Sequence, residues 1–338
     1  MRIDVHTHYR TPDYLRAMED LGAFEKITAY RILRSQIRPL VGVIPDHEHV
    51  VARLADMDAA GVDMQMLSIG AYQPYFSEAV TAAKAAHLTN DMHNSLVQRH
   101  PDRFGLFACL PLPHVEESLA ELARCLDVLH CTGINLGCSA DGRPIDDPHF
   151  DEVWAELDRR HAVVFLHPGT EDQVLIGSQE YHLAPDFGAP AELAVTLARL
   201  VIAGHTTRYP NVRIIAAMTG GALPQLLERY EHGLRQSNPE IAEALGGVGV
   251  HLRKLYYDTS ILEEPGVLEA AADRFGASRL VLGSDFGRPT ITSEGAVSYV
   301  RSAPFLSEAE KSAVLDHTAA ALLGLPRAVN TAESANGQ

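Results

Sequence analysis

Two histidines are separated by a single residue in the stretch His6-Thr7-His8, which directly follows a short apolar run. Alternate residues of a β-strand point to the same side, so both imidazoles can face one point. This arrangement suits a divalent metal ion, whose mixed nitrogen and oxygen ligand set a third imidazole and a carboxylate would complete. An isolated pair of this kind can also be two ordinary surface histidines.

Two further residues fall where they could complete that ligand set. His167 ends one short apolar run and Asp285 ends another. In a barrel of parallel strands, the C-terminal strand ends form the active-site face. This coincidence favours a metal site over a surface pair. The four predicted ligands of one divalent cation are His6, His8, His167 and Asp285.

Short apolar and β-branched runs recur along the chain and alternate with segments of helical periodicity. Several runs are continuously apolar, which is typical of strands buried on both faces of a parallel sheet. The alternation predicts an α/β fold, specifically a (β/α)8 TIM barrel, with an open doubly wound sheet as the alternative. The predicted strands cover 2–6, 64–69, 104–112, 133–137, 162–168, 212–218, 254–260 and 279–285, and the predicted helices cover 48–61, 78–100, 115–129, 150–161, 190–204, 224–236, 266–276 and 307–324.

Local signals support these boundaries. Gly61, Gly204 and Gly276 stand at predicted helix ends, where a left-handed residue commonly stops a helix. Ser307 and Glu310 form a capping-box pattern at the start of the last helix. No glycine-rich phosphate-binding motif follows any predicted strand, which argues against a nucleotide-binding version of the fold.

The chain has 338 residues, a length that by itself suggests two domains of ~150 residues. Because α/β barrels commonly form one larger domain, we instead predict a single barrel over residues 1–325. A small insertion of about residues 9–46 would lie over the end of the first strand, and residues 326–338 would form a polar tail. The long connection 169–188 could form a wall or lid of the site.

Composition narrows the classes of partner. The formal net charge of −16 argues against nucleic acid and anionic membrane surfaces as partners. No apolar run reaches the ~18 residues that a membrane span needs, and the N-terminal stretch has no signal-peptide pattern, so we expect a cytoplasmic protein. The cysteines form no C-x-x-C pair and are expected to be buried thiols. They are Cys109, Cys125, Cys131 and Cys138.

Several motifs together resemble the amidohydrolase superfamily. They are HTH after the first predicted strand, FLHPG at the fifth and LVLGSDF at the eighth, with further similar stretches over 53–70, 99–113 and 208–224. The resemblance spans roughly residues 1–325. It is closest to the branch of metal-dependent decarboxylases typified by aminocarboxymuconate-semialdehyde decarboxylase, and it extends to 6-methylsalicylate-type decarboxylases.

The resemblance implies that the four predicted ligands hold one divalent ion, with zinc expected and manganese as the alternative. Such an ion would act as a Lewis acid, and Asp285 could also carry a proton. The implied activity is a non-oxidative decarboxylation, or a related C–C bond cleavage, of a small carboxylated aromatic or unsaturated acid. The branch also implies a homodimer.

One position departs from the pattern of this branch. The branch has a histidine at the end of strand six, in a run A-H-x-G-G-A-L-P, whereas residues 217–224 read AMTGGALP and place Met218 there. A thioether donates no proton and accepts hydrogen bonds only weakly. Either Met218 packs the mouth of the barrel and another group handles the proton, or the chemistry is altered or lost.

Other polar and aromatic side chains could take part. Tyr9, His182 or Thr219 could replace the missing proton carrier, whereas His205 should face solvent at the bottom of the barrel. Asp258 could accept a hydrogen bond from a metal-bound histidine. Arginines could anchor a carboxylate and tyrosines could stack on a flat ring, although each is also an ordinary surface or packing residue. The predicted substrate contacts are Tyr9, Arg34, Arg38, Tyr72, Tyr75, His182 and Arg288, while Trp154 is expected in the core.

Two other functions fit the same ligands. Metal-activated water could attack an ester, lactone, amide or conjugated double bond, giving a hydrolase or hydratase. The third interpretation is a non-catalytic ligand-binding protein, because Met218 replaces the histidine of the branch. The complete set of four predicted metal ligands weighs against it.

Overall fold

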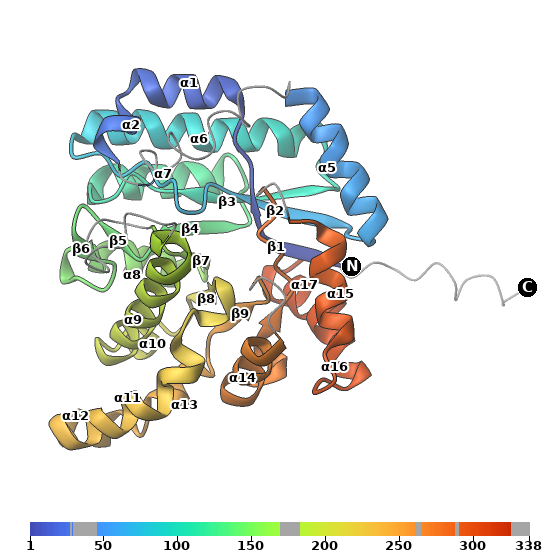
Figure 1. Cartoon of the computed structure of the whole chain (residues 1–338). Coiled ribbons are helices and arrows are strands. Elements are labelled where there is room, and N and C mark those ends of the chain that lie inside the picture. Colours follow the sequence, from blue (N-terminus) through green and yellow to red (C-terminus); the bar gives the residue numbers. More distant parts are fainter. Residues whose placement is uncertain (28, 30–45, 170–182, 261–264, 288–290, 326–338) are drawn as a thin grey trace, which may run out of the picture.

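The computed structural model describes residues 1–27, 29, 46–169, 183–260, 265–287 and 291–325. Eight parallel strands form one sheet in which neighbours follow chain order, with helices around it (Figure 1). The strands are β1 (Ile3–His8), β2 (Met64–Ser68), β3 (Phe104–Cys109), β4 (Gly133–Gly137), β7 (Val163–His167), β8 (Arg213–Ala216), β9 (Tyr256–Asp258) and β10 (Leu280–Val281). A short antiparallel pair, β5 (Ser139–Ala140) and β6 (Arg143–Pro144), follows β4.

The chain around β10 closes the sheet onto β1. Val5 N donates to Leu282 O at 2.9 Å, and Asp285 N donates to His6 O at 2.8 Å. His8 N then donates to Phe286 O at 2.7 Å. We call these contacts the seam of the barrel. They confirm the predicted TIM barrel over the open sheet.

The predicted helices are present, with ends within two residues of the expected ones. The helices are α5 (Asp46–Ala60), α6 (Ala79–Arg99), α7 (Val115–Asp127), α8 (Asp151–Arg159), α9 (Ala189–Ile202), α11 (Leu223–Ser237) and α14 (Pro265–Phe275). The last predicted helix is α16 (Glu308–Ser312) and α17 (Thr318–Leu323), joined by a π-helical turn over Ala313–His317. Its capping box at Ser307 and Glu310 is confirmed, as are the left-handed glycines that follow α5, α9 and α14.

The fold also contains short elements that sequence periodicity did not predict. In the predicted insertion, α1 (Pro12–Asp20) lies beside α6 and is followed by α2 (Ala23–Lys26) (Figure 1). The others are α10 (His205–Arg208), α12 (Pro239–Leu245), α13 (Val248–Leu252) and α15 (Ser293–Ser302), with single 3-10 or π turns at 148–150, 184–188, 218–220 and 277–279. Residues 30–45 of the insertion, 170–182 of the long connection and the predicted tail 326–338 lie outside the described residues.

The core contains the predicted tryptophan and also one residue that we expected at the surface. Trp154 is buried, and its indole N–H donates to Ile145 O at 2.9 Å. The expectation that His205 faces solvent is wrong, because its side chain is 2% exposed. Gly204 turns the chain back through a left-handed conformation, which packs the His205 ring against Trp154 at 5.1 Å between centroids. Three of the cysteines are buried as expected, whereas Cys131 is only half-buried.

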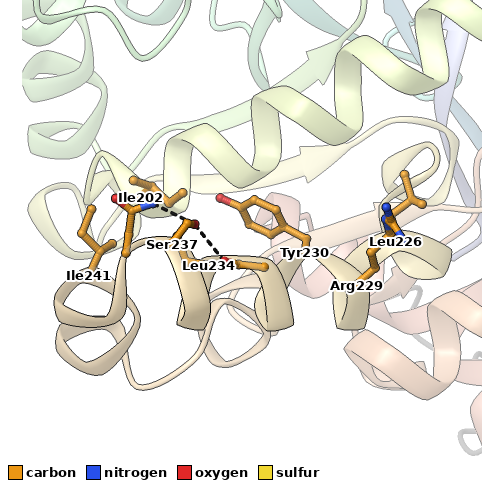
Figure 2. Close-up of a pocket in the computed structure, with 9 residues that line it drawn as sticks. Ile202, Leu226, Arg229, Tyr230, Leu234, Ser237 and Ile241 are labelled. Atoms are coloured by element: carbon orange, nitrogen blue, oxygen red, sulfur yellow. Dashed lines mark hydrogen bonds between the residues drawn. The ribbon is translucent and has the colours of Figure 1, made fainter.

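The outer helices form an apolar groove on the side of the barrel. It has a volume of about 770 Å³ and lies between the end of α9 and the helices α11 and α12 (Figure 2). Ile202, Leu226 and Tyr230 are among the side chains that line it. The groove is formed by helices and not by strand ends, so it is separate from the face that carries the predicted ligands. Among the described helices, none combines the length and apolarity needed to cross a bilayer.

Replacement of Ser307 by alanine should lower the free energy of unfolding by about 1 kcal/mol, because the helix start loses its side-chain acceptor. The Ser307 hydroxyl accepts from Glu310 N, and the Glu310 carboxylate accepts from Ser307 N in return. Urea unfolding of both proteins measures the change. The exposed Ser237→Ala is the comparison and should cost less, and an equal cost would show that the cap adds nothing.

Candidate metal centre

The structure brings the four predicted ligands together at the C-terminal end of the barrel. His6 and His8 come from β1, His167 from the end of β7 and Asp285 from the segment after β10. One ring nitrogen from each histidine lies within 4.8 Å of the others. Asp285 Oδ1 lies 3.1 Å from His8 Nε2 and 3.6 Å from His6 Nε2. All three imidazoles are buried, so the cluster is withdrawn from bulk water.

In each histidine, Nδ1 points away from the centre of the cluster and Nε2 points towards it. The hydrogen-bond partner of Nδ1 determines whether Nε2 carries a hydrogen or a lone pair. His167 Nδ1 faces Pro168 O at 2.8 Å, and a carbonyl can only accept, so Nδ1 carries the hydrogen. Ser68 Oγ donates to Thr7 O and therefore accepts from His8 Nδ1 at 3.2 Å. Both inner Nε2 atoms then present lone pairs. These histidines are neutral acceptors aimed at the centre of the cluster.

His6 is held in the same orientation by Asp258. Its Nδ1 lies 2.8 Å from Asp258 Oδ2, which is the contact expected from the sequence. Ser260 Oγ lies equally close to His6 Nδ1 but donates its own hydrogen to Asp258 Oδ1 at 2.6 Å. The His6 ring therefore donates through Nδ1 and turns Nε2 inward, where it lies 3.2 Å from His8 Nε2. Two lone pairs at this distance repel unless a cation lies between them.

The pKa values of the three histidines reflect burial and neighbouring charges. Burial lowers the pKa of His8 to about 4. Burial, followed by the charges of His6 and His8, lowers the pKa of His167 well below its ordinary value. Burial also opposes a charge on His6, but the Asp258 carboxylate and its hydrogen bond raise the pKa of His6 overall. At neutral pH the His8 and His167 rings are therefore unprotonated, as metal ligands must be.

Met218 lies beside this cluster and is tied to it through its backbone. Met218 N donates to Asp258 Oδ1 at 3.0 Å, so the carboxylate that orients His6 also fixes the start of the turn after β8. Met218 has a φ of 48°, and its half-buried side chain packs against the barrel core. These contacts agree with the packing interpretation of Met218.

A polar layer beneath the cluster supports it and was not predicted from the sequence. Asp4 accepts from Ser284 N at 2.9 Å and from Ser284 Oγ at 2.5 Å, which fixes the approach to Asp285. Burial raises the pKa of Asp4 to about 6, while those hydrogen bonds oppose the shift. Because Asp4 stands two residues before His6, strand alternation alone could have placed it on the same side.

Arg53 of α5 is the second supporting residue. Its guanidinium is fully buried, donates to Gln65 Oε1 at 3.0 Å and to His8 O, and lies 4.6 Å from the ring centroid of Phe286. Burial lowers its pKa to about 10. Arg53 thus holds both sides of the seam at His8 and Phe286. No signal in the sequence distinguishes it from an exposed helical arginine.

Gly70, just after β2, leaves the space that the His8 ring occupies. A Cβ at Gly70 would lie 2.2 Å from His8 Cε1, closer than any real contact, and its φ of +61° also disfavours other residues. A side chain at this position would therefore displace His8.

The predicted substrate contacts are only partly described. Tyr9 is buried and its hydroxyl donates to Asp46, which directs it towards α5. Tyr75 Oη accepts from Gly137 N at 2.9 Å beside the end of β4. Tyr72 stacks under the guanidinium of Arg10 at 4.4 Å, and this arginine is not among the predicted contacts. The remaining predicted contacts, Arg34, Arg38, His182 and Arg288, lie outside the described residues.

The fold and site define a TIM-barrel protein with a histidine and carboxylate cluster at the C-terminal ends of its strands. Residues 3–325 match the family model described as Amidohydrolase, and the chain belongs to that family. It is 30% identical to 6-methylsalicylic acid decarboxylase of Penicillium expansum, over 67% of this chain and 70% of that protein. It is 27% identical to 2-amino-3-carboxymuconate-6-semialdehyde decarboxylase of Dictyostelium discoideum, over 70% and 66% respectively.

Solved structures share the fold. A 5-carboxyvanillate decarboxylase from Sphingomonas paucimobilis superposes with a TM-score of 0.81 at 21% identity, over 96% of this chain and 99% of the other. A dihydroxybenzoic acid decarboxylase from Polaromonas sp. JS666, with bound manganese and the inhibitor 2-nitroresorcinol, superposes with a TM-score of 0.75 at 23% identity, over 99% of both chains. These likenesses confirm the barrel.

Replacement of Asp258 by asparagine should destabilise the metal-free protein more at low pH than at high pH. Asp258 raises the pKa of His6 in the folded state. Because the pKa of His6 is higher in the folded than in the unfolded state, its protonation stabilises the fold. This stabilisation is fully present below the unfolded-state pKa of about 6.5 and is lost as the pH rises through the folded-state pKa. Urea unfolding at about pH 5.5 and about pH 9 measures the difference. The surface variant Asp63→Asn is the control, and equal losses at both pH values would contradict the argument.

Proposed function

We propose that this protein is a metal-dependent, non-oxidative decarboxylase of a small carboxylated aromatic or unsaturated acid. The observation that carries the proposal is the cluster itself, in which three imidazole lone pairs and a carboxylate face one another in a buried site. His6, His8, His167 and Asp285 would hold one divalent ion. The named activities of the decarboxylase relatives support the reaction class.

The residues present fit such an ion. Three imidazoles and one carboxylate are a donor set that zinc favours, and manganese is the alternative that the Polaromonas structure suggests. Each imidazole has its outer nitrogen engaged, so its tautomer already suits coordination. When bound, the ion would supply Lewis-acid stabilisation of negative charge on the substrate oxygens.

Other steps of the reaction would depend on side chains of this protein. Asp285 would first take a proton from water and then deliver it to the ring or chain carbon that bears the carboxylate. The C–C bond would then break, with its electron pair returning to the substrate as CO2 leaves. Asp258 would keep His6 oriented through Nδ1. Met218 would shape the pocket wall without carrying a proton. Tyr72 and Tyr75 would flank a flat substrate, and the homodimer remains a prediction.

Metal binding provides the first test. We expect one zinc ion per chain by equilibrium dialysis, with affinity reduced at least about tenfold in His167→Ala because one of four ligands is lost. The exposed His130→Ala is the matched control and should bind like the parent protein. Equal affinity of His167→Ala and the parent would show that the cluster does not hold the ion.

The reaction provides the second test. Metal-loaded protein incubated with carboxylated phenols should release CO2, and Asp285→Asn should lower the rate at least about a hundredfold because the proton carrier is lost. Met218→Leu keeps an apolar side chain and should stay within a few-fold of the parent rate.

Each alternative gives a distinct result in this assay. Incorporation of oxygen-18 from water into the product, without CO2 release, would indicate hydrolysis or hydration. No turnover on the panel by the parent protein, together with turnover by Met218→His, would indicate a non-catalytic chain. An absence of CO2 with the metal bound would overturn the proposal.

A further inference from the structure

A second cavity lies at the opposite end of the barrel from the metal centre. It has a volume of about 150 Å³ and opens among the N-terminal ends of β8, β9 and β10. A cavity of this size holds a small organic molecule and exceeds the space that one water needs. The side chains that matter for its chemistry are Trp154, His205, Tyr209, Arg213, Lys254 and Arg279.

The cavity is positively charged in an otherwise acidic chain. Three cationic side chains line it, and none of its lining residues is acidic. Arg213 donates to two carbonyls, Leu322 O at 2.6 Å and His161 O at 2.8 Å, so these bonds leave its charge uncompensated. Nearby Arg208 is already paired with Asp151 and adds little net charge. The remaining field favours an anion.

His205 adds an unsatisfied polar group to this wall. Both of its ring nitrogens are buried and have no hydrogen-bond partner in the described part of the chain. An unpaired buried donor or acceptor lowers the stability of the folded protein, and a bound ligand with oxygen acceptors would supply a partner for the N–H. Burial lowers the pKa of His205 to about 4, so the neutral ring offers one N–H donor at physiological pH.

The rest of the wall is aromatic and aliphatic. The rings of Trp154 and Tyr209 lie 6.2 Å apart with an interplanar angle of 20°. The His205 ring is edge-on to Trp154 at 5.1 Å and tilted to Tyr209 at 5.3 Å between centroids. Tyr256 lies against the guanidinium of Arg279 at 5.1 Å. A flat ring in the cavity would pack against these apolar side chains, whereas a bare inorganic oxyanion offers them no apolar surface.

We infer that this cavity is a second ligand site, which binds a small carboxylate carried on a flat ring. The carboxylate would meet Lys254, Arg279 and the His205 N–H, and the ring would lie against Trp154 and Tyr209. The inference does not depend on the proposed decarboxylase activity. The bound anion would contact the starts of β8 and β9, the strands that lead to Met218 and Asp258 at the other end of the barrel.

The experiment uses Trp154, the single tryptophan of the chain, as the reporter. Benzoate is titrated into the full-length, metal-free protein at constant ionic strength, and the tryptophan fluorescence should change saturably. Inorganic phosphate in a parallel titration should leave it unchanged. Lys254→Met and His205→Phe should each weaken benzoate binding at least about tenfold, because a charge-assisted or buried hydrogen bond is lost.

Lys84→Met, which removes an exposed lysine of α6, is the matched control and should bind benzoate like the parent. If His205→Phe does not fold, Lys254→Met still decides the question. A silent benzoate titration, equal binding by Lys254→Met and the parent, or a phosphate response as strong as that of benzoate would overturn the inference.

Discussion

Four acceptors of hydrogen bonds converge at one end of this barrel, and the repulsion among them is the constraint on which the site depends. His6, His8 and His167 turn lone pairs towards the same point as the Asp285 carboxylate. Each imidazole is locked in that state by an acceptor at its outer nitrogen, supplied by Asp258, Ser68 or the backbone after β7. A positive charge at the centre turns this repulsion into attraction, and rotation of any of the three rings would break the hydrogen bond at its outer nitrogen.

Two buried charged residues, Asp4 and Arg53, fix the positions of the backbone segments that carry the cluster. Burying a carboxylate and a guanidinium away from water is costly unless each is hydrogen-bonded. Asp4 receives two hydrogen bonds from Ser284, and Arg53 donates to the backbone of His8 while packing against Phe286. Both residues therefore act on the seam, where β1 meets the segment that carries Asp285. Apolar residues in place of Asp4 and Arg53 would fill the same space but would leave the Ser284 N–H and the His8 carbonyl without these hydrogen-bond partners.

Much of the fold and the cluster could be predicted from the sequence because both follow from periodicity. Continuous apolar runs identified the strands, and the rule that strand ends share one face brought His167 and Asp285 to the histidine pair. Residues whose role depends on chain reversal or on packing were not predictable. His205 was misplaced because Gly204 folds α10 back under the barrel. Arg53 looks in the sequence like any helical arginine, and only the closed barrel shows that its guanidinium is enclosed.

The position of the cluster on the seam has a consequence for how the molecule is made. The first two imidazoles belong to the first strand of the barrel, whereas the carboxylate and the backbone that pairs with β1 belong to the segment that follows the last strand. Nearly the whole barrel must therefore be synthesised before β1 finds its second neighbour. Until that pairing forms, β1 lacks one of its two strand partners, and unpaired backbone groups of this kind invite pairing with another chain. Completion of the centre and removal of that exposed edge are thus one event in the maturation of the protein.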